Sequence, residues 1–173
     1  FPKAVWVEWD PLSKDAAREG AALAFGRPLR AHLALENADV IAAFDADILC
    51  DDSEALANAR AWAKRRRAGD GTMNRLYAIE AAYSLTGGSA DHRIAVTSAL
   101  VPVVLGRLAE KLLESGATLP AGIEGIRDAI SRCAAHPFDD PRIGVLAHDL
   151  IDAKGKGAIV VGPRQPAAAH ALA

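Results

Sequence analysis

Cysteine is scarce in this chain of 173 residues, and its scarcity removes several kinds of site. The two cysteines, Cys50 and Cys133, are far apart in the sequence and match no zinc or iron–sulfur ligand spacing. A disulfide between them is compatible with the sequence, but no second feature supports it. We therefore expect no metal site in the chain.

Long apolar runs and an excess of charge are also missing. No apolar run approaches the ~20 residues that a helix needs to cross a bilayer, and no signal-peptide pattern is present. The formal net charge of -2 provides no electrostatic footprint for nucleic acid or for an anionic membrane. We expect neither nucleic-acid binding nor direct membrane insertion.

The chain does have the composition of a globular domain, with 51% hydrophobic and 24% charged residues. The β-rich runs predict strands at Ala4–Trp9, Val40–Phe44, Leu76–Ile79, Ile94–Val96 and Ala158–Val161. Helical patterns lie between them, at Lys14–Phe25, Ser53–Arg67, Leu100–Ser115, Gly122–Ala135 and Val145–Ala153. This alternation predicts a three-layer α/β fold, with a mostly parallel sheet and helices on both faces.

The two ends of the sequence suggest a piece of a longer protein. The chain begins at Phe1 without a methionine and stops in Ala167–Ala173, which has the pattern of an opening helix. We expect residues 1–173 to form a single α/β domain excised from a larger chain.

The run Val40–Phe44 is apolar throughout and is bounded by Asp39 and Asp45, which is typical of a central strand buried on both faces. Ligands of open α/β sheets bind outside the carboxyl ends of the strands, so Asp45 and Asp47 stand where a ligand is expected. Four carboxylates in this region would repel a phosphate, namely Asp45, Asp47, Asp51 and Asp52. The position of these carboxylates therefore favours a ligand site, whereas their charge disfavours a phosphate ligand.

Three further motifs invite a functional interpretation. The turn Thr86–Ser89 could cradle a phosphate, but it is neither a P-loop nor a dinucleotide fingerprint. His92, between Asp91 and Arg93, could act as a base, but neighbouring strand residues point to opposite faces and no nucleophile elbow is present. The basic run at residues 64–67 is typical of a solvated helix end. We favour structural roles for all three.

Several motifs occur in a defined order along most of the chain. The first group is Phe25-Gly26, Glu36–Ile41 and Ala90–Ile94. The second group is Met73–Tyr77, Glu80, Ser84–Gly87 and Ala90–Arg93, together with Asp45–Asp47, Val160–Gly162, Gln165-Pro166 and His170–Ala173. The first group resembles the central α/β domains of the molybdopterin oxidoreductase superfamily, in the formate dehydrogenase and DMSO reductase fold. The second is similar to the molybdopterin-oxidoreductase-like, iron–sulfur-fused B subunit of alternative complex III.

The resemblance also shows where this chain departs from catalytic members of the superfamily. Their loop after the strand matched by Val40–Phe44 is typically Gly-Ser/Thr-Asn-Pro and holds a pyranopterin guanine dinucleotide, whereas this chain has Asp45–Ile48. Their next strand typically ends Asp-Pro-Arg-Arg-Thr, and here it ends Glu80–Ser84. Like charges ~4 Å apart repel by about 4 kcal/mol at an intermediate dielectric, so we expect no cofactor to bind. The expected vestigial pocket consists of Asp45, Asp47, Glu80, Thr86, Gly87 and Gln165.

The resemblance implies a non-catalytic scaffold domain of a membrane-associated, quinol-oxidising electron-transfer complex on the periplasmic side. Its partners would be the other subunits and an iron–sulfur domain of the same parent chain. The alternative is the cofactor-binding domain of an active molybdopterin (bis-guanine dinucleotide) oxidoreductase, with its other cofactor residues outside this chain. A weaker third interpretation is a module whose carboxylates bind Mg²⁺ or Ca²⁺.

Overall fold

The computed structural model describes residues 1–7, 9, 13–67, 69, 71, 73–119 and 124–173. Its sheet has four parallel strands in the order β3-β2-β1-β4. The strands are β1 (Val40–Phe44), β2 (Arg75–Glu80), β3 (His92–Ala95) and β4 (Gly157–Val161). The predicted α/β class and parallel sheet are confirmed.

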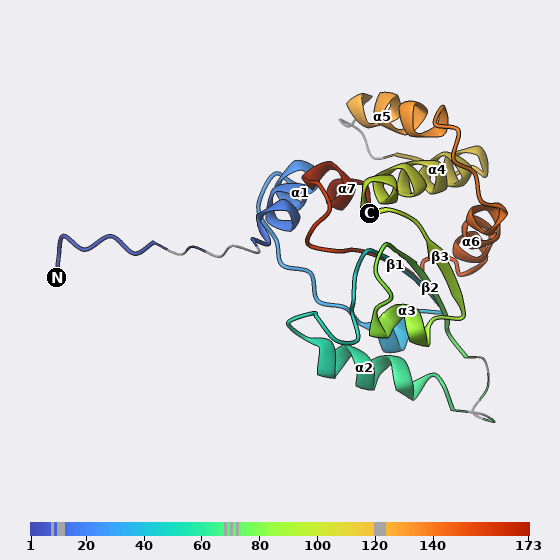
Figure 1. Cartoon of the computed structure of the whole chain (residues 1–173), viewed down its shortest axis with the longest axis horizontal. Helices are drawn as coiled ribbons and strands as arrows, with labels where there is room; N and C mark the ends of the chain where they lie inside the picture. Colours follow the sequence, from blue (N-terminus) through green and yellow to red (C-terminus); the bar gives the residue numbers. More distant parts are fainter. Residues whose placement is uncertain (8, 10–12, 68, 70, 72, 120–123) are drawn as a thin grey trace.

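Two apolar cores, one on each face of the sheet, make the fold three-layered (Figure 1). On one face Phe44, Tyr77 and Ile79 pack with side chains from α4 (Val101–Glu114), α6 (Pro141–Asp152) and α7 (Ala167–Leu172). On the other face Ile41, Ala43 and Leu76 pack with α2 (Ala55–Lys64) and the short turn η1 (Leu35–Asn37). Successive side chains of a strand point to opposite faces, so one apolar run supplies both cores.

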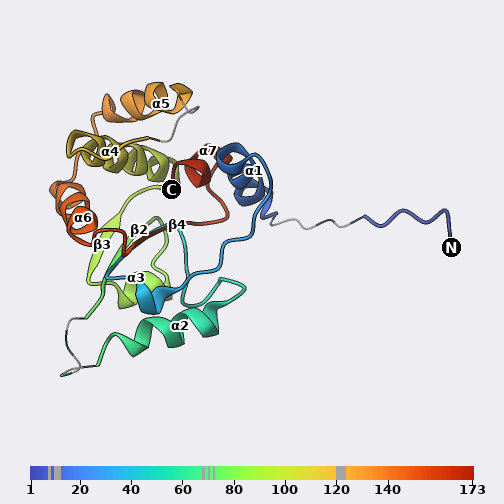
Figure 2. The ribbon, with the colours of Figure 1, turned by 180° about the vertical axis from the view of Figure 1, so that it is seen from behind.

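The remaining helices extend these layers. α1 (Asp15–Phe25) packs against α7, and α5 (Glu124–Ala134) packs on the outer side of α4, as the views from front and behind show (Figures 1 and 2). The short helix α3 (Leu85–Ser89) follows β2. α1 ends as predicted at Gly26, whose φ of 71° suits a residue without a Cβ.

The central placement of β1 is confirmed, since it pairs with β2 on one side and with β4 on the other. All five of its residues are buried, and Ile41 has no exposed surface. The carboxyl ends of all four strands therefore meet at one edge of the sheet, where Asp45 and Glu80 lie.

The predicted strand at Ala4–Trp9 is wrong. Residues 4–7 and Trp9 form no strand, and Val5 and Val7 are 84% and 78% exposed. Alternating β-branched and aromatic residues favour a strand only where a partner strand is available, and no strand of this molecule pairs with them within the described residues. The pair Asp10-Pro11, which predicts a turn after this strand, lies outside the described residues, as does Glu8.

Several helix boundaries also differ from prediction. α6 begins at Pro141, because Asp140 accepts a hydrogen bond from the Arg142 N–H at 2.9 Å and caps the helix. Ser53 and Ser13 are residue types that the sequence predicts as N-caps of α2 and α1. Glu54 instead holds the N-cap position of α2, without a side-chain cap. Lys14 is the N-cap of α1, although the Ser13 hydroxyl accepts a hydrogen bond from the Asp15 N–H at 3.0 Å. Gly122, the predicted start of α5, lies outside the described residues.

Candidate functional site

The six residues of the expected pocket lie at the carboxyl edge of the sheet. Five of them are buried: Gly87, and Asp45, Glu80, Thr86 and Gln165, which are at most 5% exposed. Their hydrogen bonds join loops that are far apart in the sequence. The edge is therefore a network of buried polar groups.

Asp45 is the centre of this network. Its Oδ2 accepts hydrogen bonds from Ser98 Oγ at 2.8 Å and from Gln165 Nε2 at 3.0 Å. The backbone of Asp45 has a φ of 52°, in the left-handed region, which aspartate tolerates better than most residues. The loop after β1 is thereby fixed to the loops after β3 and β4.

Asp47 holds the loop after β2. Its Oδ1 accepts hydrogen bonds from the Thr86 N–H at 3.0 Å and from the Thr86 hydroxyl at 2.6 Å. Thr86 Oγ1 in turn accepts the Leu49 N–H at 3.1 Å. Asp47 therefore binds the first turn of α3, where a carboxylate complements exposed backbone N–H groups.

Glu80, at the end of β2, is paired inside the protein. Arg93 Nε donates to its Oε1 at 2.6 Å, and the side chain of this glutamate is 3% exposed. The Ser84 hydroxyl donates to the other carboxylate oxygen. Arg93 also lies over the ring of Tyr83, 4.9 Å from its centroid. The buried carboxylate thus has a charge partner, as a buried acid requires.

The glycines of α3 do not offer free N–H groups to a phosphate. The Gly87 N–H donates to the Ser84 hydroxyl at 2.9 Å, and the Gly88 N–H donates to the Ser84 carbonyl at 2.9 Å. A Cβ at position 87 would lie 1.8 Å from Glu80 Oε1. Gly87 therefore makes room for a carboxylate of the protein itself.

These contacts decide whether a guanine dinucleotide fits. Its phosphates need cations or free N–H and O–H donors. The Arg93, Ser98, Thr86 and Gln165 donors are bonded to the three acids at this edge. A shallow depression beside the edge has no charged lining residue; it is lined by Ala81, Ala95, Val96, Thr97 and Ser98. These four donors are not free to bind the phosphates.

Asp91, His92 and Arg93 do not act together in the structure. Asp91 binds Arg66 through two hydrogen bonds of 2.9 and 2.7 Å, while Arg93 binds Glu80. His92 stacks on Tyr77 with ring centroids 4.7 Å apart. The three side chains have separate partners, which favours the structural interpretation.

The basic run at the end of α2 is part of the structure as well. Arg65 donates to Asp39 at 2.6 Å, and Arg66 joins Asp91 to the Asn74 carbonyl, which it contacts at 2.6 Å. Burial raises the pKa of Asp91, but hydrogen bonds from Arg66 and the Leu76 N–H lower it more, leaving it below its usual 3.8. Two arginines of this run therefore hold the amino end of the sheet rather than facing a ligand.

A second buried pair lies beneath α6. The Tyr77 hydroxyl donates to Asp149, which Arg75 also contacts at 2.6 Å. Burial, and then the hydrogen bond to Asp149, raise the pKa of Tyr77 to about 12. This tyrosine stays protonated at neutral pH and joins β2 to α6.

The described residues contain no candidate metal site, no disulfide and no helix that could span a membrane. No group of three or more His, Cys, Asp or Glu side chains there is placed to hold a metal ion. Cys50 and Cys133 are both free thiols, and burial raises the pKa of Cys133. None of the helices in the described ranges is long and apolar enough to cross a bilayer.

The sequence did not identify three partners of the acids. Ser84 and Arg93 stand within the quoted motifs without a predicted role, and Ser98 lies in a loop outside them. Arg93 had one signal, since it lies on the strand next to β2, opposite Ala78 and two residues before the position that pairs with Glu80. Ser98 had none, because its contact with Asp45 spans 53 residues.

Comparison with known proteins adds no further assignment. No family model matches the chain, and no curated protein matches it. The geometry of the carboxyl edge and the motif resemblance are therefore the basis for a functional proposal.

Proposed function

We propose that this chain is a non-catalytic scaffold domain of a membrane-associated, quinol-oxidising electron-transfer complex, as its similarity to the B subunit of alternative complex III implies. One observation carries the proposal: Asp45, Asp47 and Glu80 are each bonded to a donor of this chain. In a cofactor-binding member of the fold those positions would face the guanosine and phosphates. Here they hold loops to one another.

The same network suggests how a scaffold domain would work. Asp45 and Asp47 connect the loops after all four strands, through Ser98, Gln165 and Thr86. A surface fixed in this way can hold a neighbouring subunit without rearranging, which lowers the entropic cost of association. The proposed neighbours are an iron–sulfur domain of the parent chain and the other subunits of the complex, on the periplasmic side.

The test is cofactor analysis of the full-length parent chain. The protein is purified after expression with a supply of molybdenum cofactor, and molybdenum and guanine nucleotide are measured per chain. We expect neither at a stoichiometric level. Titration with a guanine nucleotide should show no saturable binding.

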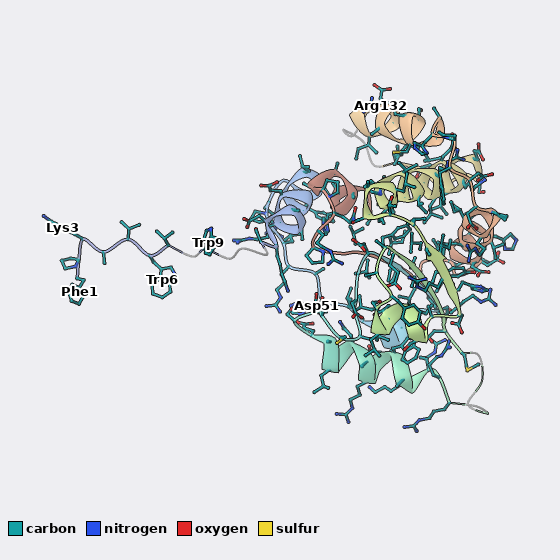
Figure 3. All side chains as sticks on the ribbon, in the orientation of Figure 1. Phe1, Lys3, Trp6, Trp9, Asp51 and Arg132 are labelled. Carbon is teal, nitrogen blue, oxygen red and sulfur yellow. The ribbon has the colours of Figure 1, made fainter. Side chains whose placement is uncertain are left out.

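A pair of variants makes the test specific to the edge. Asp45→Lys adds a cation to the buried network, and Asp51→Lys makes the same change at an exposed aspartate nearby (Figure 3). Stoichiometric cofactor in the wild-type parent that is lost in Asp45→Lys and retained in Asp51→Lys would establish the alternative, an active molybdopterin oxidoreductase domain.

A further inference from the structure

The basic run at residues 64–67 divides between two environments. Arg65 and Arg66 are partly buried and bind carboxylates of this chain. Lys64 and Arg67 are exposed, and so is Arg60, which lies one turn before Lys64 on the same face of α2. These three exposed cations form a basic row along α2 and just past its end, and they take no part in holding the sheet.

The basic row has no acid to neutralise it. Within the part of the chain that the structure describes, no ion pair or hydrogen bond joins these three side chains to a carboxylate. Glu54, the N-cap of α2, is bound instead by Arg30 at 3.2 Å and by His32 at 2.9 Å. Arg60 precedes the last turn of the helix, so the macrodipole does not account for it. Like charges one turn apart, as at Arg60 and Lys64, destabilise a helix.

Apolar side chains lie on the same outer face of α2. Leu56 is 89% exposed and precedes Arg60 by one turn, and Ala63 is exposed beside them. The surface is hollowed here into a shallow depression, lined by Ser53, Glu54, Leu56, Ala57 and Arg60. The opposite face of α2 packs on the sheet through Trp62. An apolar contact bordered by charged groups is the usual arrangement of a protein–protein interface.

We propose that the outer face of α2 docks an acidic surface of a neighbouring protein. Leu56 makes the apolar contact, and carboxylates of the partner pair with Arg60, Lys64 and Arg67. Arginine suits this role because its planar guanidinium binds a carboxylate through two parallel hydrogen bonds. The proposal goes beyond the scaffold function and does not depend on it, since it follows from the face of α2 alone.

Two other anionic partners fit this face less well. Duplex DNA carries one charge per ~1.7 Å of its axis, so it favours proteins with many more cations than a row of three on a chain of net charge -2. A helix that lies in an anionic membrane buries a broad apolar face in the lipid, whereas that face of α2 is packed on the sheet. Three cations around one leucine match an acidic protein surface.

A titration with an acidic peptide tests the proposal. The probe is a fluorescent helical peptide rich in glutamate with leucine in a heptad repeat, and its anisotropy is followed as the chain is added. The wild-type chain should bind it saturably, and more weakly as salt is raised. Arg60→Glu with Lys64→Glu should raise the dissociation constant at least ~10-fold, because like charges then face each other.

The matched control makes the same change of net charge elsewhere. Arg127 and Arg132 are exposed on α5, which packs on α4 at the other side of the sheet (Figure 3). Arg132 stands in the last turn of α5, as Lys64 does in α2. Arg127→Glu with Arg132→Glu should therefore bind the peptide as the wild type does.

Leu56→Ser separates the apolar contact from the charges. It should weaken binding of the leucine-containing peptide and leave binding of polyglutamate unchanged. An absence of saturable binding to the wild type would overturn the proposal, and so would equal weakening in the two double variants, which would reduce the interaction to net charge. Tighter binding of duplex DNA or of phosphatidylglycerol vesicles, lost with Arg60→Glu and Lys64→Glu, would assign the face to that partner and would also overturn it.

Discussion

Gly87 and Gly162 lie where the polar edge of the sheet is most closely packed. A Cβ at position 87 would meet Glu80 Oε1 at 1.8 Å, and a Cβ at position 162 would meet the Asp45 carbonyl oxygen at 1.8 Å. Neither glycine has a φ in the left-handed region, so space rather than backbone freedom requires them. Glycine at these two positions leaves room for the Glu80 side chain and for the Asp45 backbone.

Gly87→Ala tests this role. We expect a loss of about 1–3 kcal/mol in the free energy of unfolding, because the carboxylate of Glu80 must move away from Arg93. Gly125→Ala in α5 is the control, since no atom lies within 4 Å of its added Cβ. Urea denaturation measures both, and equal effects would contradict the close packing of Gly87 on Glu80.

Asp91 predicts a pH dependence of stability. Its folded pKa is lower than its usual 3.8, since the Arg66 and Leu76 hydrogen bonds outweigh burial. The stabilisation is therefore complete above the unfolded pKa and is lost as pH falls through the lowered folded value. Asp91→Asn should be less stable than wild type at neutral pH, and the difference should shrink below pH 3.8.

Unfolding free energies measured from neutral pH down into the acid range check this. Arg66→Ala removes the same ion pair by deleting the arginine. Its unfolding free energy should therefore also fall less than that of the wild type as the pH is lowered. If the gap between wild type and Asp91→Asn grew on acidification, the assigned direction of the shift would be wrong.

At the scale of the element, β1 is the strand on which both cores depend. Ile41→Asp should reduce the free energy of unfolding by several kcal/mol, because it places an unpaired charge among Leu35, Ala43 and Leu76. Leu56→Asp on α2 is the control, because Leu56 is 89% exposed. Equilibrium denaturation should separate the two, and a loss below about 1 kcal/mol at Ile41 would contradict its central place.

The sequence predicted elements well where a local signal sufficed. The apolar run of β1 and the glycine that ends α1 both identify their structures directly. The Asp140-Pro141 pair at the start of α6 is an equally local signal, although the helix predicted from periodicity begins only at Val145. Such errors concern boundaries, and better use of capping signals would correct them.

The strand at Ala4–Trp9 was mispredicted for a different reason. Strand propensity is a property of side chains, whereas a strand is a property of a pair, and no described strand pairs with residues 4–7. The places of Asp45, Asp47 and Glu80 follow from strand-end geometry. Their hydrogen bonds to Ser98 and Arg93 could not be predicted, because they depend on contacts across long stretches of chain.

At the scale of the whole molecule, polar side-chain contacts connect loops at both ends of the strands, at the carboxyl edge and at the amino end. Gln165 reaches Asp45 across 120 residues, and Arg66 reaches Asp91 across 25. Side chains of this kind join segments that the apolar cores alone do not order. The buried contact between Gln165 and Asp45 favours one arrangement of the loops, since any other leaves a buried carboxylate unpaired.

The link between Asp45 and Gln165 allows the most direct test of that statement. Gln165→Ala removes one of two close donors to a carboxylate whose side chain is 2% exposed, so it should cost about 1–3 kcal/mol of unfolding free energy. Arg164→Ala is the control on the neighbouring residue. Arg164 is 67% exposed and lies 3.7 Å from the same oxygen, and an exposed pair contributes about 0–1 kcal/mol.

Ser98→Ala completes the test, because Ser98 donates to the same carboxylate oxygen at 2.8 Å. With both donors removed, Asp45 keeps only the Ala81 N–H at 3.5 Å and the exposed Arg164. The double variant should therefore lose more stability than the two single losses added together, by about 0.5 kcal/mol or more in a double-mutant cycle from chemical denaturation. Strict additivity would mean that Asp45 does not couple the loops after β3 and β4, and the edge would then be three independent contacts instead of one network.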